Sequence, residues 1–312
     1  MKTSGIYGFE FTRPFQAAGL TFTPLYSEFG DAKERARDLK IHHLTGTVSG
    51  ADLADDEVTY RLEAVLSFIE RLDVRLSEPS DEAAAAATNP LEHFEEVQRL
   101  GGRNNGGGAV IATDVFGLHR DARKDFIDRA MRHLARDEPS KPSKLTLLLF
   151  KSTETFRQRR PFLEVSYFLL MSGLEAFART AQNDFGSNAA APMARELARL
   201  GFDVYENRPQ DLPRSMSTYL HIRNAIFHNG ELAKSVRLND ADVTLESGEY
   251  LFHLQMLVCL TIMKALGFED RHRNWASWID RRLYGNYGHF DPMKFFKAKG
   301  AIELKPECSD EQ

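Results

Sequence analysis

The segment from Phe162 to Gln182 constrains the fold most, because the helix that it predicts is apolar on nearly every face. Its apolar residues include Leu163, Val165, Phe168, Leu169, Met171, Leu174 and Phe177. A helix that is apolar all round must be enclosed by other elements. Helical periodicity also predicts helices at 145–157, 191–202, 213–228 and 250–266. We therefore expect the C-terminal half to be an all-helical bundle with 162–182 at its centre.

The N-terminal part shows a different pattern, in which apolar and polar residues alternate. The alternating positions are Tyr7, Phe9 and Phe11, then Leu20 and Phe22, followed by a β-prone piece at Ile41 and Leu44 that ends at Gly46 or Gly50. A period of two is typical of half-buried strands. The bounded apolar run at 108–116 suits a further, buried strand. These segments predict an N-terminal sheet.

Three helices are expected to accompany this sheet, at 55–78, 91–100 and 119–137. The best boundary between the two parts is Asp137–Ser143, which holds two prolines and no large apolar residue. The helix at 119–137 could belong to either side of it. We predict an α+β fold, with a mixed α/β region at 1–138 and a helical domain with an aromatic C-terminal tail at 144–312.

Composition excludes several classes of protein. The net charge is −5, so no global cationic field points to nucleic acid, although a local basic cleft is still allowed. The two cysteines, Cys259 and Cys308, are too few for a disulfide scaffold. No apolar run approaches the ~20 residues of a membrane span, and the first residues lack the apolar core of a signal peptide. We expect a soluble, cytoplasmic protein without membrane contact.

Residues that could bind a metal or a cofactor show no suitable spacing. The histidines at 42, 43, 93, 119, 133, 272 and 289 are scattered and form neither an HExxH motif nor a Cys/His ligand set. A nucleophile elbow and a dinucleotide-binding fingerprint are also lacking. We therefore expect no metal site and no cofactor.

The segment Tyr219–Gly230 carries the strongest functional signal. It is apolar enough for a core helix, yet it contains Arg223, Asn224 and His228 before it stops at Asn229-Gly230. Buried polar groups of this kind are costly unless they are paired or used. Arg223-Asn224-x3-His228 resembles the R-x4-6-H signature of HEPN domains, and the resemblance covers about residues 144–267.

The resemblance to HEPN domains implies a helical bundle that forms homodimers, and many members of that family are metal-independent endoribonucleases. It implies RNA as the substrate and a role in prokaryotic defence, as in antiphage, abortive-infection and toxin–antitoxin systems. Sensor regions precede the nuclease bundle in several Apea-like HEPN proteins, so residues 1–138 are expected to be a sensor or recognition region. The alternative is a non-catalytic HEPN-like module for dimerisation or for binding nucleotide or RNA.

The expected chemistry is attack of the ribose 2′-hydroxyl on the adjacent phosphate. His228 would transfer protons, Arg223 would bind the phosphate and Asn224 would orient the reacting groups. Five residue steps separate Arg223 and His228 by about 140° around an α-helix. The two side chains can meet on a substrate if the helix loosens near Gly230, or if two copies of the helix face each other. The resemblance favours the second route.

Further residues are candidates for supporting roles. Glu175 is expected to pair with Arg223, and His221 to line the same cleft, whereas Arg157, Arg159 and Arg160 would contact the RNA backbone. Each has a plainer alternative: a solvated or interface acid, a surface histidine and a solvated helix end. Arg223 and His228 themselves could simply cap the end of a helix. A partner that restrains or triggers the activity is left open.

Overall fold

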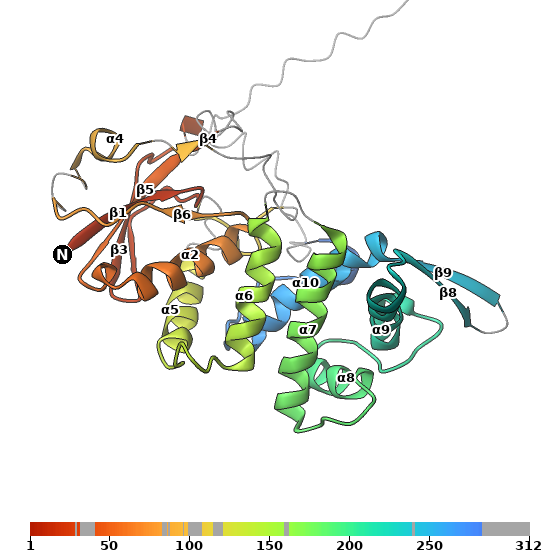
Figure 1. Cartoon of the computed structure of the whole chain (residues 1–312). Helices are drawn as coiled ribbons and strands as arrows, with labels where there is room; N and C mark the ends of the chain where they lie inside the picture. Colours follow the sequence, from red (N-terminus) through yellow and green to blue (C-terminus); the bar gives the residue numbers. More distant parts are fainter. Residues whose placement is uncertain are drawn as a thin grey trace, which may run out of the picture.

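The protein is described here by a computed structural model that covers residues 1–282 except 29, 32–40, 83–85, 87, 96, 99–107, 115–120, 159–161 and 239–240. An α/β unit at the N-terminus is followed by a helical unit, and a small hairpin extends from the far end (Figure 1). The predicted mixed α+β class is confirmed. None of the helices in the described part combines the length and the apolarity needed to cross a membrane.

Five short strands form the N-terminal sheet. They are β1 (Lys2–Tyr7), β2 (Phe15–Ala17), β3 (Leu20–Pro24), β5 (Leu44–Gly50) and β6 (Arg75–Leu76), in the antiparallel order β2-β3-β5-β1-β6. Gly46 is required in β5, because a Cβ there would lie 2.4 Å from the carbonyl oxygen of Thr23. The strands predicted near residues 20 and 44 are confirmed. The first strand lies earlier than predicted, so Phe9 and Phe11 are buried in the loop after it.

Two helices cover this sheet, α2 (Asp56–Glu70) and α5 (Ala122–Leu134), and a 3-10 turn (Asp52–Ala54) precedes α2. The helix predicted at 55–78 therefore extends eight residues too far at its C-terminal end. It ends because Arg71 adopts a left-handed conformation with φ 52°, and the chain then enters β6. The helix predicted at 119–137 is confirmed as α5, which packs against α2 and β2.

Two other predictions for this region are wrong. Residues 108–114 form no strand, because their backbone is bonded elsewhere: Val110 N–H donates to the Ile69 carbonyl, and Arg123 donates to the carbonyls of Ile111 and Ala112. Residues 115–116 lie outside the described part. In place of a helix over 91–100, a short helix α4 (Pro90–His93) is followed by β7 (Val97–Gln98), which pairs with β4 (Ile41–His42).

The expected linker Asp137–Ser143 separates α5 from α6 (Lys144–Arg157), but it is held tightly. The Asp137 carboxylate accepts hydrogen bonds from Ser143 N–H at 2.7 Å and from Thr146 Oγ1 at 2.5 Å. The Ser143 hydroxyl in turn caps α6 by accepting from Thr146 N–H. One apolar core runs through both sides of this connection. The α/β unit and the helices therefore share an interior.

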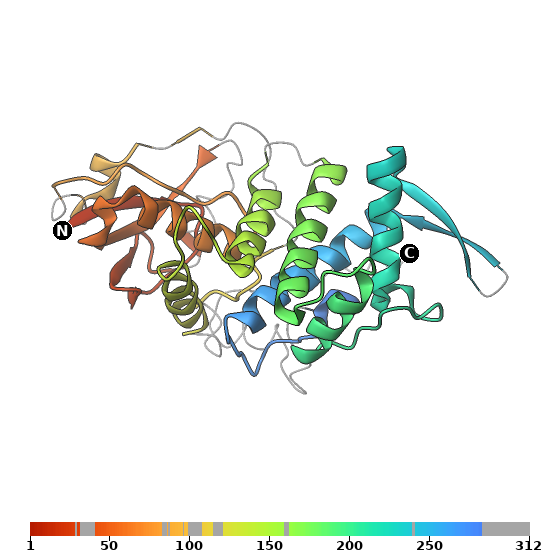
Figure 2. The same ribbon diagram turned by 60° about the horizontal axis from the view of Figure 1, so that its bottom comes forward.

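The helical unit is built around α7 (Leu163–Gln182), as predicted. α7 packs against α6, α8 (Ala190–Arg199), α9 (Met216–Asn224) and α10 (Ser247–Ala265) (Figure 2). α7 is not enclosed on every side, however. Phe162, immediately before it, and Val165 and Phe168 in its first turns are 64%, 47% and 45% exposed. The apolar pattern therefore includes a surface stripe as well as core positions.

The segment after Gly230 forms a β-hairpin of β8 (Ala233–Leu238) and β9 (Ala241–Glu246), so the prediction of an all-helical C-terminal half is wrong. Val236 and Val243 face each other across it and are half-buried. Beyond α10 a short helix α11 (Ser277–Asp280) buries Trp278. The rest of the predicted aromatic tail, from Tyr284 on, lies outside the described residues.

Candidate active site

The motif helix has three parts. A 3-10 turn (Leu212–Arg214) leads into α9, which begins after Ser215, three residues later than the predicted start at 213. A π-helical turn at Ala225–Asn229 follows, and Gly230 ends it in a left-handed conformation with φ 67°. Glycine adopts this conformation without strain, so the predicted end of the helix at Asn229-Gly230 is confirmed.

The π turn alters the geometry of the motif. Its hydrogen bonds run from residue i to i+5 rather than to i+4, which widens the helix and reduces the rotation per residue. Most of the step from Arg223 to His228 falls inside this turn. The angle between the two side chains is therefore smaller than the 140° expected of an α-helix. Turns of this kind occur frequently at functional sites.

The inner face of the motif helix anchors it in the core. Met216, Tyr219, Ile222 and Ile226 are buried. The buried Tyr167 hydroxyl of α7 donates a hydrogen bond to the Tyr219 carbonyl at 3.2 Å, one turn before Arg223. Burial, and then the neighbouring Tyr219 and Tyr250, raises the pKa of Tyr167 well above its usual value, so the hydroxyl stays a donor. These contacts fix the position of the helix relative to α7.

Arg223 and Glu175 contact each other across α7 and α9. Arg223 Nη2 lies 3.6 Å from Glu175 Oε2, so the structure brings together the two residues that were expected to pair. Glu175 is shared, because its other oxygen accepts a hydrogen bond from Arg179 at 2.8 Å. Arg223 Nε is buried and has no hydrogen-bond partner. Arg223 is thus oriented by one distant carboxylate, and its side chain is 31% exposed, although the buried Nε is out of reach of a ligand.

The other motif residues lie on the outer surface. His221, Asn224 and His228 are exposed, and no described residue holds their side chains by a hydrogen bond or an ion pair. They are accessible to a ligand or to a second protein chain. Their exposure on one helix beside a fixed arginine is compatible with binding an anion and exchanging protons, but one chain alone brings only one histidine of the motif to this place.

Four residues beside the motif were not predicted. Phe227, 44% exposed, packs on Phe168 of α7 with ring centroids 4.9 Å apart. Lys151 of α6 donates to Ser172 Oγ at 2.9 Å and lies over the Phe168 ring at 5.9 Å. One sequence signal pointed to Phe168, because the apolar stripe of α7 is wider than a buried face requires. We call Lys151, Phe168, Ser172 and Phe227 the flanking cluster.

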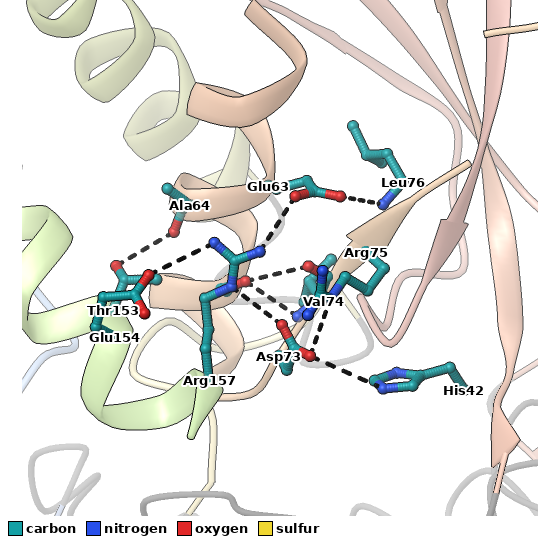
Figure 3. Close-up of polar contacts among 11 residues, drawn as sticks. His42, Glu63, Ala64, Asp73, Val74, Arg75, Leu76, Thr153, Glu154 and Arg157 are labelled. Atoms are coloured by element: carbon teal, nitrogen blue, oxygen red, sulfur yellow. Dashed lines mark hydrogen bonds and ion pairs between the residues drawn. The ribbon is translucent and has the colours of Figure 1, made fainter. Parts of the chain in front are cut away.

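Arg157 lies elsewhere, at the junction between α6 and the α/β unit (Figure 3). Its guanidinium contacts Asp73 at 3.1 Å, Glu63 at 3.2 Å and Glu154 at 3.7 Å, and the side chain is 11% exposed. Asp73 also pairs with Arg75 and lies 4.0 Å from His42. Three carboxylates thus surround the Arg157 guanidinium, which favours a structural role over the predicted contact with RNA. Arg159 and Arg160 lie outside the described residues.

No group of three or more histidine, cysteine or carboxylate side chains that could hold a metal occurs within the described ranges. Cys259 is a buried thiol. Comparisons of the chain with protein-family models, with curated proteins and with solved structures give no match. The assignment of a function therefore rests on the motif and its surroundings.

Proposed function

We propose that this chain is a metal-independent endoribonuclease that acts as a homodimer, with Arg223 and His228 in its active site. One observation carries the proposal: Arg223, which contacts Glu175 and is 31% exposed, lies on a helix whose π turn presents the exposed His228. The resemblance of Arg223-Asn224-x3-His228 to the HEPN signature agrees with it, as does a helical bundle around the motif.

The reaction needs three contributions from the protein: proton transfer, stabilisation of negative charge and orientation of the phosphate. The ribose 2′-oxygen attacks phosphorus as its proton passes to a base, and the bond from phosphorus to the 5′-oxygen breaks as that oxygen receives a proton. His228 exchanges these protons near neutral pH. Arg223 binds the non-bridging oxygens and stabilises the charge that develops on them. Asn224, exposed one residue further on, orients the phosphate. The products are a 2′,3′-cyclic phosphate and a 5′-hydroxyl.

The need for both a base and an acid supports a dimer. One histidine cannot accept a proton and donate another in the same step, whereas two copies of the motif helix supply two histidines. Because His221, Asn224 and His228 are exposed, a second copy can approach this face without unfolding either chain. His221 would line the shared cleft.

The biological role is proposed from the resemblance. Cleavage of cellular RNA in the cytoplasm suits a toxin or an antiphage defence protein that acts by abortive infection. The α/β unit would then be the sensor or recognition part. Its shared core with α6 and the Arg157 junction supply a physical connection between the two.

The direct test is RNA cleavage by the purified full chain in the presence of EDTA. Parent protein should yield fragments with cyclic phosphate ends, and Arg223→Ala and His228→Ala should not. His272→Ala is a matched control, because His272 is a histidine outside the motif. On expression in a host, the parent should be toxic and the two motif variants should not be. Equal growth and equally intact RNA for all proteins would refute the proposal.

A second candidate is a non-catalytic interaction module, favoured by the exposed apolar side chains of Phe162, Val165, Phe168 and Phe227. Contiguous exposed apolar surface often marks a protein interface. On this alternative, Arg223→Ala would weaken the dimer and His228→Ala would leave RNA untouched. Sedimentation velocity on the same variants separates the two candidates, since the nuclease proposal predicts soluble, dimeric but inactive proteins.

A further inference from the structure

We propose that the flanking cluster is a subsite for single-stranded RNA, in which Phe168 and Phe227 stack an unpaired base and Lys151 binds an adjacent phosphate. The inference rests on the proposed nuclease function and deepens it, because it specifies the conformation of the substrate. It is carried by contacts that the motif itself does not use.

The two aromatic rings form an accessible apolar surface beside the motif. Phe168 and Phe227 are each nearly half exposed, and their rings contact each other at 4.9 Å with an angle of 58° between the planes. A tilted pair of this kind offers ring faces to a third ring. Aromatic side chains stack the bases of single strands in this way, whereas the bases of a duplex are already stacked.

Lys151 adds a charge that the fold leaves uncompensated. Its ammonium group donates to Ser172 Oγ and lies over the Phe168 ring, and no carboxylate in the described part of the chain pairs with it. An ammonium group has three donors, so two are available after the bond to Ser172. Partial burial, and then Lys144, lowers the pKa of Lys151, which is consistent with a charge that lacks an anion.

Charge favours RNA over a second protein copy as the occupant of this cluster. An aromatic pair with a lysine beside it, and with Arg223 four residues before Phe227 on the motif helix, matches an anionic strand with flat bases. Glu164 is exposed on α7 one turn before Phe168, and Ser172, which binds Lys151, lies one turn after it, so the strand should cross α7 on the Ser172 and Lys151 side of Phe168.

The experiment uses the full chain and a fluorescent 2′-O-methyl oligonucleotide, which cannot be cleaved because it lacks the nucleophile. Binding of this single strand and of the same sequence as a duplex is measured by anisotropy for parent, Phe168→Leu, Phe227→Leu and Lys151→Met. Leucine keeps apolar bulk but removes the ring. Phe185→Leu is the matched control, since Phe185 is 69% exposed beyond the other end of α7.

We expect each phenylalanine variant to bind the single strand roughly tenfold more weakly, and Lys151→Met to bind it more weakly with a smaller dependence on salt. The duplex should bind poorly to all proteins. Equal binding by parent and variants, or a change confined to the oligomeric state, would overturn the subsite and favour a dimer contact. If the parent neither binds nor cleaves RNA, the proposed function itself fails.

Discussion

Two clusters of arginines and carboxylates in this molecule are built from the same residue types and differ in their balance. At the junction, Arg157 is 11% exposed and meets three carboxylates. At the motif, Arg223 is 31% exposed, and its one carboxylate lies at 3.6 Å and is shared with Arg179. At the junction, the charge of Arg157 is balanced by carboxylates of the protein. At the motif, one shared carboxylate leaves Arg223 able to bind a further anion.

The difference teaches how to separate structural from functional arginines. A buried guanidinium is stabilised by anions around it. If carboxylates of the protein fully surround the guanidinium, the arginine has a structural role. Where the protein supplies only part, a ligand can supply the rest. Arg157 therefore connects α6 to the α/β unit (Figure 3), and Arg223 is available to a phosphate.

The largest effect is expected at the motif. Arg223→Ala and His228→Ala should each reduce the rate of RNA cleavage about a thousandfold, because the first removes charge stabilisation and the second removes proton transfer. The free energy of unfolding should change little for His228→Ala, since its side chain is exposed. Single-turnover cleavage measures the rate, and urea denaturation measures the free energy of unfolding. If a variant lost stability and activity together, the residue would have a structural role and no catalytic one.

The opposite pattern is expected at the junction. Arg157→Met should lower the free energy of unfolding by about 3 kcal/mol, because Glu63 and Asp73 would be left without their main partner. Urea denaturation measures this loss, and cleavage by the protein that remains folded should persist. Arg75→Ala is the control: Arg75 pairs with the same Asp73 but is 49% exposed, so its loss should cost less than about 1 kcal/mol. Equal losses of unfolding free energy for Arg157→Met and Arg75→Ala would show that the Arg157 cluster contributes no more than an exposed ion pair.

Glu175 tests the support of Arg223. Glu175→Gln keeps the shape of the side chain and removes its charge, so Arg223 should lose orientation and cleavage should slow about tenfold. Glu196→Gln is a comparable change at another carboxylate that pairs with an arginine, Arg199, away from the motif, and it should leave the rate unchanged. An unaltered rate for Glu175→Gln would show that Arg223 does not need the acid.

The smallest effect concerns pH at the α5–α6 connection. Burial opposes ionisation of Asp137, but hydrogen bonds from Thr146 and Ser143 outweigh it and lower the pKa. A lowered pKa stabilises the fold above the pKa of the unfolded state, and the contribution is lost as pH falls below about 3.9 toward the lower folded value. As the pH falls, the free energy of unfolding should therefore decrease less for Asp137→Asn than for the parent. The difference should be less than about 1 kcal/mol. A parallel loss in both proteins would contradict this.

The sequence predicted those parts of the fold in which local pattern decides structure. The helices α5, α6, α7 and α10 followed from periodicity, and Gly230 followed from its place after the motif. The end of α2 at Arg71 and the irregular path of 108–114 did not, because Arg123 and other residues distant in sequence determine them. The hairpin after Gly230 was missed because most of its described side chains are exposed, so its apolar pattern is weak.

The candidate site was predictable only in outline. Arg223, His228 and the contact with Glu175 followed from the motif and its resemblance, but the π turn depends on how Ile226 and Phe227 pack. Arg157 looked like a free basic residue, since its partners Glu63 and Asp73 lie far away in sequence. Lys151 and Phe168 lie beside the motif because α6, α7 and α9 pack together. This packing could not be predicted from the sequence.

The most direct test of the central claim uses an RNA in which a single cleaved linkage is preceded by a 2′-deoxyribose. The account predicts that the purified protein no longer cuts at that linkage, while cutting elsewhere on the same molecule continues at the original rate. Cleavage at the deoxy linkage with undiminished rate would contradict attack by the 2′-hydroxyl. It would also remove the roles assigned to Arg223 and His228 in that step.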